Sequence, residues 1–86
     1  MDNASGGDDF GVPIYTFARS GSEEIRISLN EYKGHEYIDL RVFYKSPSGF
    51  LPTKRGLTLK REHVLELIQG VAELANVLGI DLTEEE

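Results

Sequence analysis

The sequence predicts an α+β fold, in which a four-stranded antiparallel sheet is followed by one C-terminal helix (ββββα). Two observations carry this prediction. Apolar and polar residues alternate between Ile25 and Phe43, which is typical of strands with one buried face. After Lys60 the apolar residues instead recur at spacings of three and four, as on one face of an amphipathic helix.

The first two strands are expected on either side of a short polar turn. The β-prone run at residues 14–19 is stopped by Ser20-Gly21-Ser22. At residues 25–30 three aliphatic side chains alternate with polar ones and predict the second strand. Lys33-Gly34-His35 then predicts a tight hairpin turn, because Gly34 can adopt the positive φ that such turns need.

The third strand is predicted where Ile38, Leu40 and Val42 continue the alternation. It is expected to end at Ser46-Pro47-Ser48-Gly49, which has the composition of a β-turn. Residues 50–55 have an extended pattern, but Pro52 lacks a backbone donor. The fourth strand is therefore expected to be irregular, with an edge, a bulge or a strand end at this proline.

The helix is predicted from about Lys60, and Gly79-Ile80 supply a left-handed stop with an apolar residue after it. Its apolar stripe is expected to cover the sheet. That stripe consists of Val64, Leu67, Ile68, Val71, Leu74, Ala75 and Leu78. Leu65, Ala72 and Val77 widen the apolar surface beyond one partner, which indicates a second helix from a twin subunit.

The 86 residues are expected to form one small domain at residues 13–80, between acidic tails at residues 1–12 and 81–86. We expect the N-terminal tail to be disordered. So small a domain buries only ~60% of its unfolded surface, which favours a homodimer. The chain has no cysteine, no signal-peptide pattern and no apolar run of membrane-spanning length. An intracellular protein is expected, in the cytoplasm or nucleoid of a bacterium or in the nucleus of a eukaryote.

The formal net charge of −6 conceals a basic block. Residues 25–61 carry a net charge of +5, whereas residues 1–24 carry −4 and residues 62–86 carry −7. Five aromatic residues lie within the block: Tyr32, Tyr37, Phe43, Tyr44 and Phe50. Positive charge interleaved with aromatic rings is typical of surfaces that bind unpaired bases.

Two motifs in this block each have a functional and a structural interpretation. Lys54-Arg55-Gly56 could bind phosphates, or it could be a solvated turn. Tyr32 beside Lys33 could stack on a base, or it could cap the edge of the core.

Neither a metal site nor an enzyme active site is expected. His35 and His63 are far apart, with no partner at ligand spacing, so no metal or other cofactor is predicted. Paired carboxylates for acid–base chemistry would need a pocket that so small a chain scarcely provides.

The middle of the chain resembles the single-stranded-DNA-binding domain of the transcriptional coactivator family known as positive cofactor four. The resemblance covers residues 14–80. It rests on four segments in the family's order: Ile27-Ser28-Leu29-Asn30-Glu31-Tyr32-Lys33-Gly34, Ile38-Asp39-Leu40-Arg41, Pro47-Ser48-Gly49 and Pro52-Thr53-Lys54-Arg55-Gly56-Leu57-Thr58-Leu59.

This resemblance implies a strongly curved sheet backed by the helix and a homodimer formed through helices and sheet edges. It implies binding of single-stranded DNA, or of RNA, with little sequence preference and no catalysis, and partners among transcription proteins. The implied nucleic-acid-binding residues are Tyr32, Lys33, Arg41, Tyr44, Lys54 and Arg55.

The chain departs from the family pattern at several of these positions. Tyr44 stands where the family often has tryptophan, and His35 replaces a lysine. Arg41 and Tyr44 are three residues apart, so they would face opposite sides of a flat strand. Either a bulge or strong curvature intervenes, or Phe43 is the exposed ring instead.

A protein-interaction module remains the alternative function. In that case the sheet edge near Pro52 or the helix binds a partner protein, and the basic residues meet an acidic one. The acidic tails could also compete with nucleic acid for the basic surface.

Overall fold

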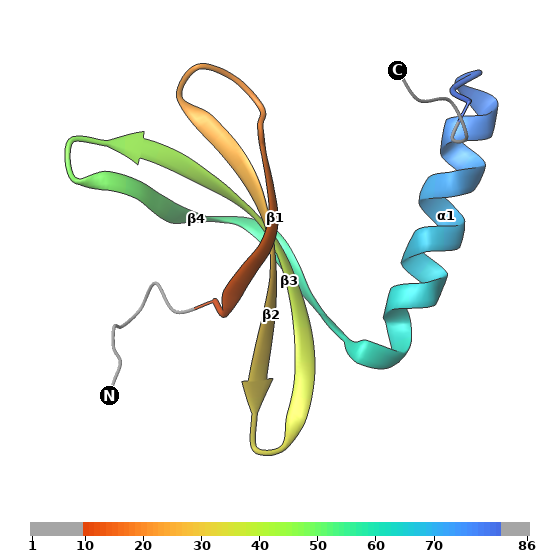
Figure 1. Ribbon diagram of the computed structural model, residues 1–86, viewed down its shortest axis with the longest axis horizontal. Coiled ribbons are helices and arrows are strands. Elements are labelled where there is room, and N and C mark those ends of the chain that lie inside the picture. Colours follow the sequence, from red (N-terminus) through yellow and green to blue (C-terminus); the bar gives the residue numbers. More distant parts are fainter. Residues whose placement is uncertain (1–9, 82–86) are drawn as a thin grey trace.

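The computed structural model describes residues 10–81 and confirms the predicted order of elements (Figure 1). The strands are β1 (Val12–Ala18), β2 (Glu23–Tyr32), β3 (His35–Ser46) and β4 (Gly49–Lys60). A 3₁₀ turn, Arg61–His63, leads into the helix α1 (Val64–Val77). Most of both predicted tails, residues 1–9 and 82–86, lies outside the described residues.

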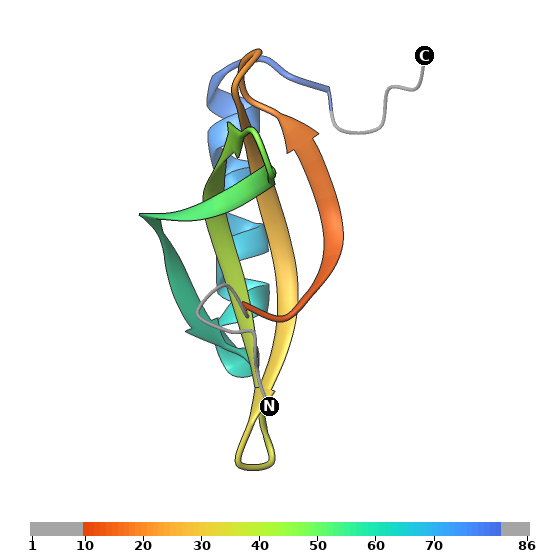
Figure 2. The ribbon, with the colours of Figure 1, turned by 90° about the vertical axis from the view of Figure 1, so that its left-hand side faces the viewer.

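The four strands form one antiparallel sheet in the order β1-β2-β3-β4, so each strand pairs with its neighbour in sequence. The strands bend strongly along their length, as the resemblance implied (Figure 2). Pairing of β2 with β3 is regular from Tyr32 opposite His35 to Glu23 opposite Tyr44. This long ladder fixes which side chains share a face.

The two hairpins that flank β3 have the predicted turns. Lys33 and Gly34 both have positive φ, at 53° and 81°, as a two-residue turn matched to the twist of the strands requires. In the other hairpin Ser46 pairs with Gly49, and the Ser46 hydroxyl donates to the Gly49 carbonyl at 2.6 Å.

The fourth strand is irregular where Pro52 predicted it to be. Arg41 of β3 pairs with Gly56 and Phe43 pairs with Pro52, so Thr53–Arg55 bulge out opposite the single residue Val42. The Thr53 hydroxyl donates to the Val42 carbonyl at 2.7 Å and accepts the Arg55 N–H at 3.1 Å. These bonds fix the shape of the bulge.

The helix ends in the Schellman motif that Gly79-Ile80 predicted. Gly79 has a φ of 76°, the Ile80 N–H donates to the Ala75 carbonyl at 2.8 Å, and the Gly79 N–H donates to Asn76 at 3.1 Å. No helix within residues 10–81 has the length and hydrophobicity needed to cross a lipid bilayer.

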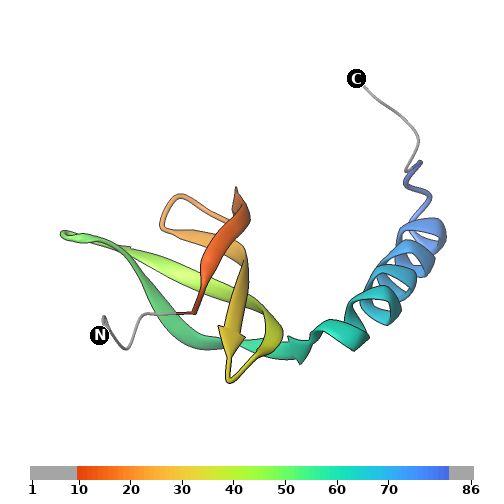
Figure 3. The ribbon, with the colours of Figure 1, turned by 60° about the horizontal axis from the view of Figure 1, so that its bottom comes forward.

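The prediction that the helix covers its own sheet is wrong for the single chain. The 3₁₀ turn leads the chain out of β4 and away from the strands, and α1 stands apart from them (Figures 1 and 3). Leu65 is therefore 64% exposed and Leu74 56%. Leu57, on the sheet, is 48% exposed. Among residues 10–81, nothing covers the apolar face of the helix or Leu57 on the sheet.

Candidate nucleic-acid interface

The β4 bulge gathers three of the predicted site residues, Tyr44, Lys54 and Arg55, which we call the bulge cluster. Lys54 and Arg55 project from the bulge opposite Val42, and Tyr44 lies two residues further along β3. The side chains of Lys54 and Arg55 are exposed, and the Tyr44 ring is 42% exposed. A flat ring and two long cations are therefore accessible at one end of the sheet.

Tyr44 rather than Phe43 is the accessible ring. Phe43 is 4% exposed, and the guanidinium of Arg26 lies over it at 4.2 Å from the ring centroid. Strand alternation alone left the two rings as alternatives, and the burial of Phe43 decides between them.

Tyr32 and Lys33, the tip cluster, lie at the β2–β3 turn. Tyr32 is 61% exposed, and the Lys33 ammonium lies 5.3 Å from the centroid of its ring. Measured along β3 at ~3.3 Å per residue, the path from the Tyr32–His35 pair to Tyr44 is roughly 30 Å. Because the ladder has no register shift, Tyr32 shares the face of Arg41, and the two clusters therefore lie at opposite ends and on opposite faces of the β2–β3 ladder.

Arg41, the sixth predicted site residue, is engaged within the chain. Its Nε and Nη2 donate to the two carboxylate oxygens of Asp39 at 3.0 and 2.8 Å, and Nη1 donates to the Thr53 carbonyl at 3.0 Å. The Phe10 ring covers the guanidinium at 4.1 Å. With 10% of the Arg41 side chain and 3% of the Asp39 side chain exposed, this is a nearly buried ion pair.

The alternation of faces explains why Arg41 and Tyr44 are separated. Because β2 and β3 pair without a register shift, Arg41 shares its face with Arg26 directly opposite, whereas Tyr44 shares the other face with Glu23. A bulge was one of the expected ways to bring Arg41 and Tyr44 to one face, but the bulge lies in β4 and the pairing of β3 with β2 has no register shift, so the two residues stay on opposite faces.

Arg26 is a charged residue of this sheet that the site prediction did not include. Two arginines directly opposite would repel each other, but each is paired with a carboxylate on its own strand. Arg26 Nε donates to Glu24 at 2.6 Å, as Arg41 donates to Asp39. The alternating Glu24-Ile25-Arg26 pattern is the sequence signal for this pairing.

The Arg55 guanidinium also has a partner. One of its nitrogens donates to the carboxylate of Glu23, the residue that pairs directly with Tyr44. The side chain of Arg55 nevertheless remains 54% exposed.

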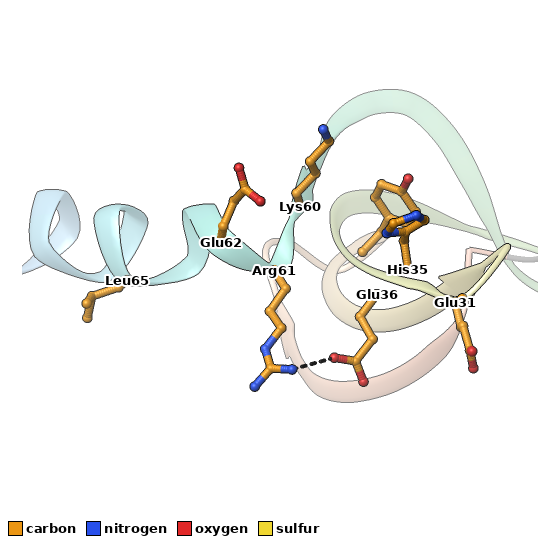
Figure 4. Close-up of a pocket in the computed structure, with 9 residues that line it drawn as sticks. Glu31, His35, Glu36, Lys60, Arg61, Glu62 and Leu65 are labelled. Atoms are coloured by element: carbon orange, nitrogen blue, oxygen red, sulfur yellow. Dashed lines mark hydrogen bonds and ion pairs between the residues drawn. The ribbon is translucent and has the colours of Figure 1, made fainter.

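A groove of about 800 Å³ lies beside the tip cluster, between the β2–β3 turn and the start of the helix (Figure 4). Arg61 crosses it to pair with Glu36 at 3.2 Å, whereas Lys60 points away from that pair. The lining mixes both signs of charge: Glu31, Gly34, His35, Glu36, Tyr37, Lys60, Arg61, Glu62 and Leu65. The bulge cluster is not part of this groove.

The described surface can neutralise phosphates and stack on bases without any metal. Among residues 10–81, no three His, Cys, Asp or Glu side chains are grouped so that they could hold a metal ion. Exposed rings beside exposed cations are the arrangement by which proteins bind single strands with little sequence preference.

Comparisons with known proteins agree with the fold. The family model described as Transcriptional Coactivator p15 (PC4) matches residues 20–70. A PC4 homolog from Burkholderia pseudomallei, in its orthorhombic crystal form, is 32% identical with a TM-score of 0.73, over 78% of this chain and 92% of that one. Its tetragonal form is 30% identical with a TM-score of 0.70, over 76% and 97%.

A bacteriophage T5 protein shares the fold at lower identity. It is described as a homolog of the eukaryotic transcription coactivator PC4 implicated in recombination-dependent DNA replication. It is 19% identical with a TM-score of 0.62, over 84% of this chain and 82% of that one. The search of curated protein sequences gives no match.

Proposed function

Because this chain belongs to the PC4 family of transcriptional coactivators, we propose that it is a non-enzymatic protein that binds single-stranded DNA as a homodimer. Binding tolerates any base sequence, because it uses rings and phosphate-binding cations rather than base edges. A role in transcription regulation inside the cell follows from the family.

The bulge cluster is the observation that carries this proposal. Tyr44 offers a ring for a base, and Lys54 and Arg55 reach out for the phosphates beside it. At the far end of the ladder the tip cluster repeats the combination of ring and cation, but Tyr32 is on the face of Arg41, so a strand that contacts both clusters passes from one face of the sheet to the other. Arg41 remains a predicted contact, although its guanidinium is already bound by Asp39.

The dimer is proposed from the two uncovered apolar surfaces. Ile68, Val71 and Leu74 are each more than half exposed on one face of α1. Fully burying one such side chain contributes about 1.5–3 kcal/mol, so several of them stabilise a helix-to-helix contact between two copies substantially. A second copy supplies the matching helix and an apolar sheet face.

The test is fluorescence anisotropy of a labelled thymine oligonucleotide and of a duplex of equal length, at one fixed low salt concentration. We expect the single strand to bind more tightly, because only unpaired bases can stack on Tyr32 and Tyr44. A uracil RNA of the same length decides whether the surface prefers DNA or RNA. Preference for the duplex would contradict the proposal.

The second candidate is protein interaction through the outer strand β1, all of whose residues are exposed. Val12, Ile14, Tyr15 and Phe17 make this edge apolar, which suits addition of a strand from another protein. A folded dimer that binds no oligonucleotide but captures an acidic partner protein would favour this function.

A further inference from the structure

Glu23 occupies a position between two arginines from different parts of the sheet. Its Oε1 lies 3.4 Å from Nη1 of Arg19, and its Oε2 accepts from Nη2 of Arg55. One carboxylate therefore bridges two guanidinium groups. Each guanidinium binds one of its two oxygens.

Backbone geometry brings these three residues together across 36 positions of the chain. Arg19 follows β1, and its N–H donates to the Glu23 carbonyl at 2.9 Å across the β1–β2 turn. Arg55 comes from the β4 bulge and reaches across β3 to the start of β2. The bulge is therefore what places the second guanidinium beside Glu23.

The bridging carboxylate lies next to the exposed ring. Glu23 is paired directly with Tyr44, and directly opposed residues of an antiparallel ladder lie on the same face. A nucleotide stacked on Tyr44 carries its phosphate close to the same place. A carboxylate and a phosphodiester both present two anionic oxygens, and guanidinium groups bind either.

The exposure of these ion pairs allows the arginines to exchange partners. The Arg19 and Arg55 side chains are 48% and 54% exposed, and solvent-exposed ion pairs contribute little to stability. The Arg41–Asp39 pair is the opposite case, because both of its side chains are almost buried. Of these pairs, those of Glu23 are the ones a competing anion can open.

We propose that Glu23 holds the place of a phosphate group, and that Arg19 and Arg55 form a phosphate subsite beside Tyr44 from which nucleic acid displaces it. This inference rests on the proposed single-strand binding and adds Arg19 to the surface. Glu23 acts as an internal competitor that lowers the affinity for nucleic acid. With Glu23 in place, the two arginines carry one net positive charge; without it they would carry two.

The test is Glu23→Gln, measured by anisotropy with a labelled thymine oligonucleotide from 50 to 200 mM salt. The second free charge steepens the slope of log K against log salt by about 0.7. If the electrostatic contribution vanishes near 1 M salt, affinity rises about eightfold at 50 mM and about threefold at 200 mM. Adding Arg19→Gln to this variant returns the slope to that of the wild type.

The matched control is Glu24→Gln, which removes the same charge one residue away, on the opposite face and beside Arg26. Its slope stays that of the wild type if the subsite exists. Equal slopes for the Glu23 and Glu24 variants, or weaker binding by a Glu23→Gln protein whose thermal melting is unchanged, would overturn the inference. If the wild-type protein binds no single-stranded oligonucleotide, the proposed function is contradicted, and this inference falls with it.

Discussion

Replacing Asp39 with alanine tests whether Arg41 is held within the fold. The carboxylate of Asp39 accepts two bonds from Arg41 and one from the Thr58 hydroxyl at 2.9 Å, with 3% of its side chain exposed. Its loss leaves the Arg41 charge buried, unpaired and directly opposite Arg26. Breaking a buried pair in this way costs about 3–5 kcal/mol.

The assay is urea unfolding followed by circular dichroism at one fixed protein concentration, because the stability of the proposed homodimer depends on protein concentration. With an m-value of about 1–1.5 kcal/mol/M for a chain of this size, the midpoint falls by about 2–5 M. This is a large part of the stability of a small domain.

The double variant Asp39→Ala with Arg41→Met is the control. Replacing both partners of a buried pair with apolar groups is often nearly neutral, so the double variant recovers most of the lost stability. A loss below about 1 kcal/mol for Asp39→Ala, or a double variant no more stable than the single one, would refute the assignment of Arg41 to the fold.

Three further predictions concern the binding surface and the dimer. Lys54→Ala with Arg55→Ala weakens binding to all sequences alike and makes the salt slope shallower by about 1.4, as oligonucleotide titrations would show. Tyr44→Ala loses about 1–3 kcal/mol of binding with an unchanged slope, and a changed slope would argue against stacking. Val71→Asp, on the exposed helix face, converts the dimer to monomers in sedimentation equilibrium, whereas Glu73→Gln leaves it intact.

The turn, the helix end and the irregular strand of this fold were predicted from individual residues. Gly34 and Gly79 stand where the backbone has positive φ, and Pro52 marks the irregular strand. These features depend on the conformational range of one residue or on a missing donor, so neighbouring sequence is enough to predict them.

The location of the helix could not be predicted in the same way. An apolar stripe shows that one face of a helix must be buried, but it does not say which chain buries it. The direction of α1 is set by the short turn at Arg61–His63, where neither Lys60 nor His63 supplies a side-chain cap.

The ion pairs of the site could not be predicted from the sequence pattern either. Arg55 and Glu23 are 32 residues apart and meet only because three residues of β4 bulge opposite Val42. Arg41 and Asp39 are near neighbours, but their burial depends on the strands and on the Phe10 ring around them. A basic residue that looked free in the sequence could therefore already have an internal partner.

The salt dependence of wild-type binding to a thymine oligonucleotide tests the central claim most directly. Lys33, Lys54 and the Arg19–Glu23–Arg55 group each offer one net positive charge on the accessible surface. Neutralising about three phosphates per protomer predicts a log–log slope of about −2 for one strand bound to one protomer. A slope near zero, or no binding by the folded protein at low salt, would contradict the account.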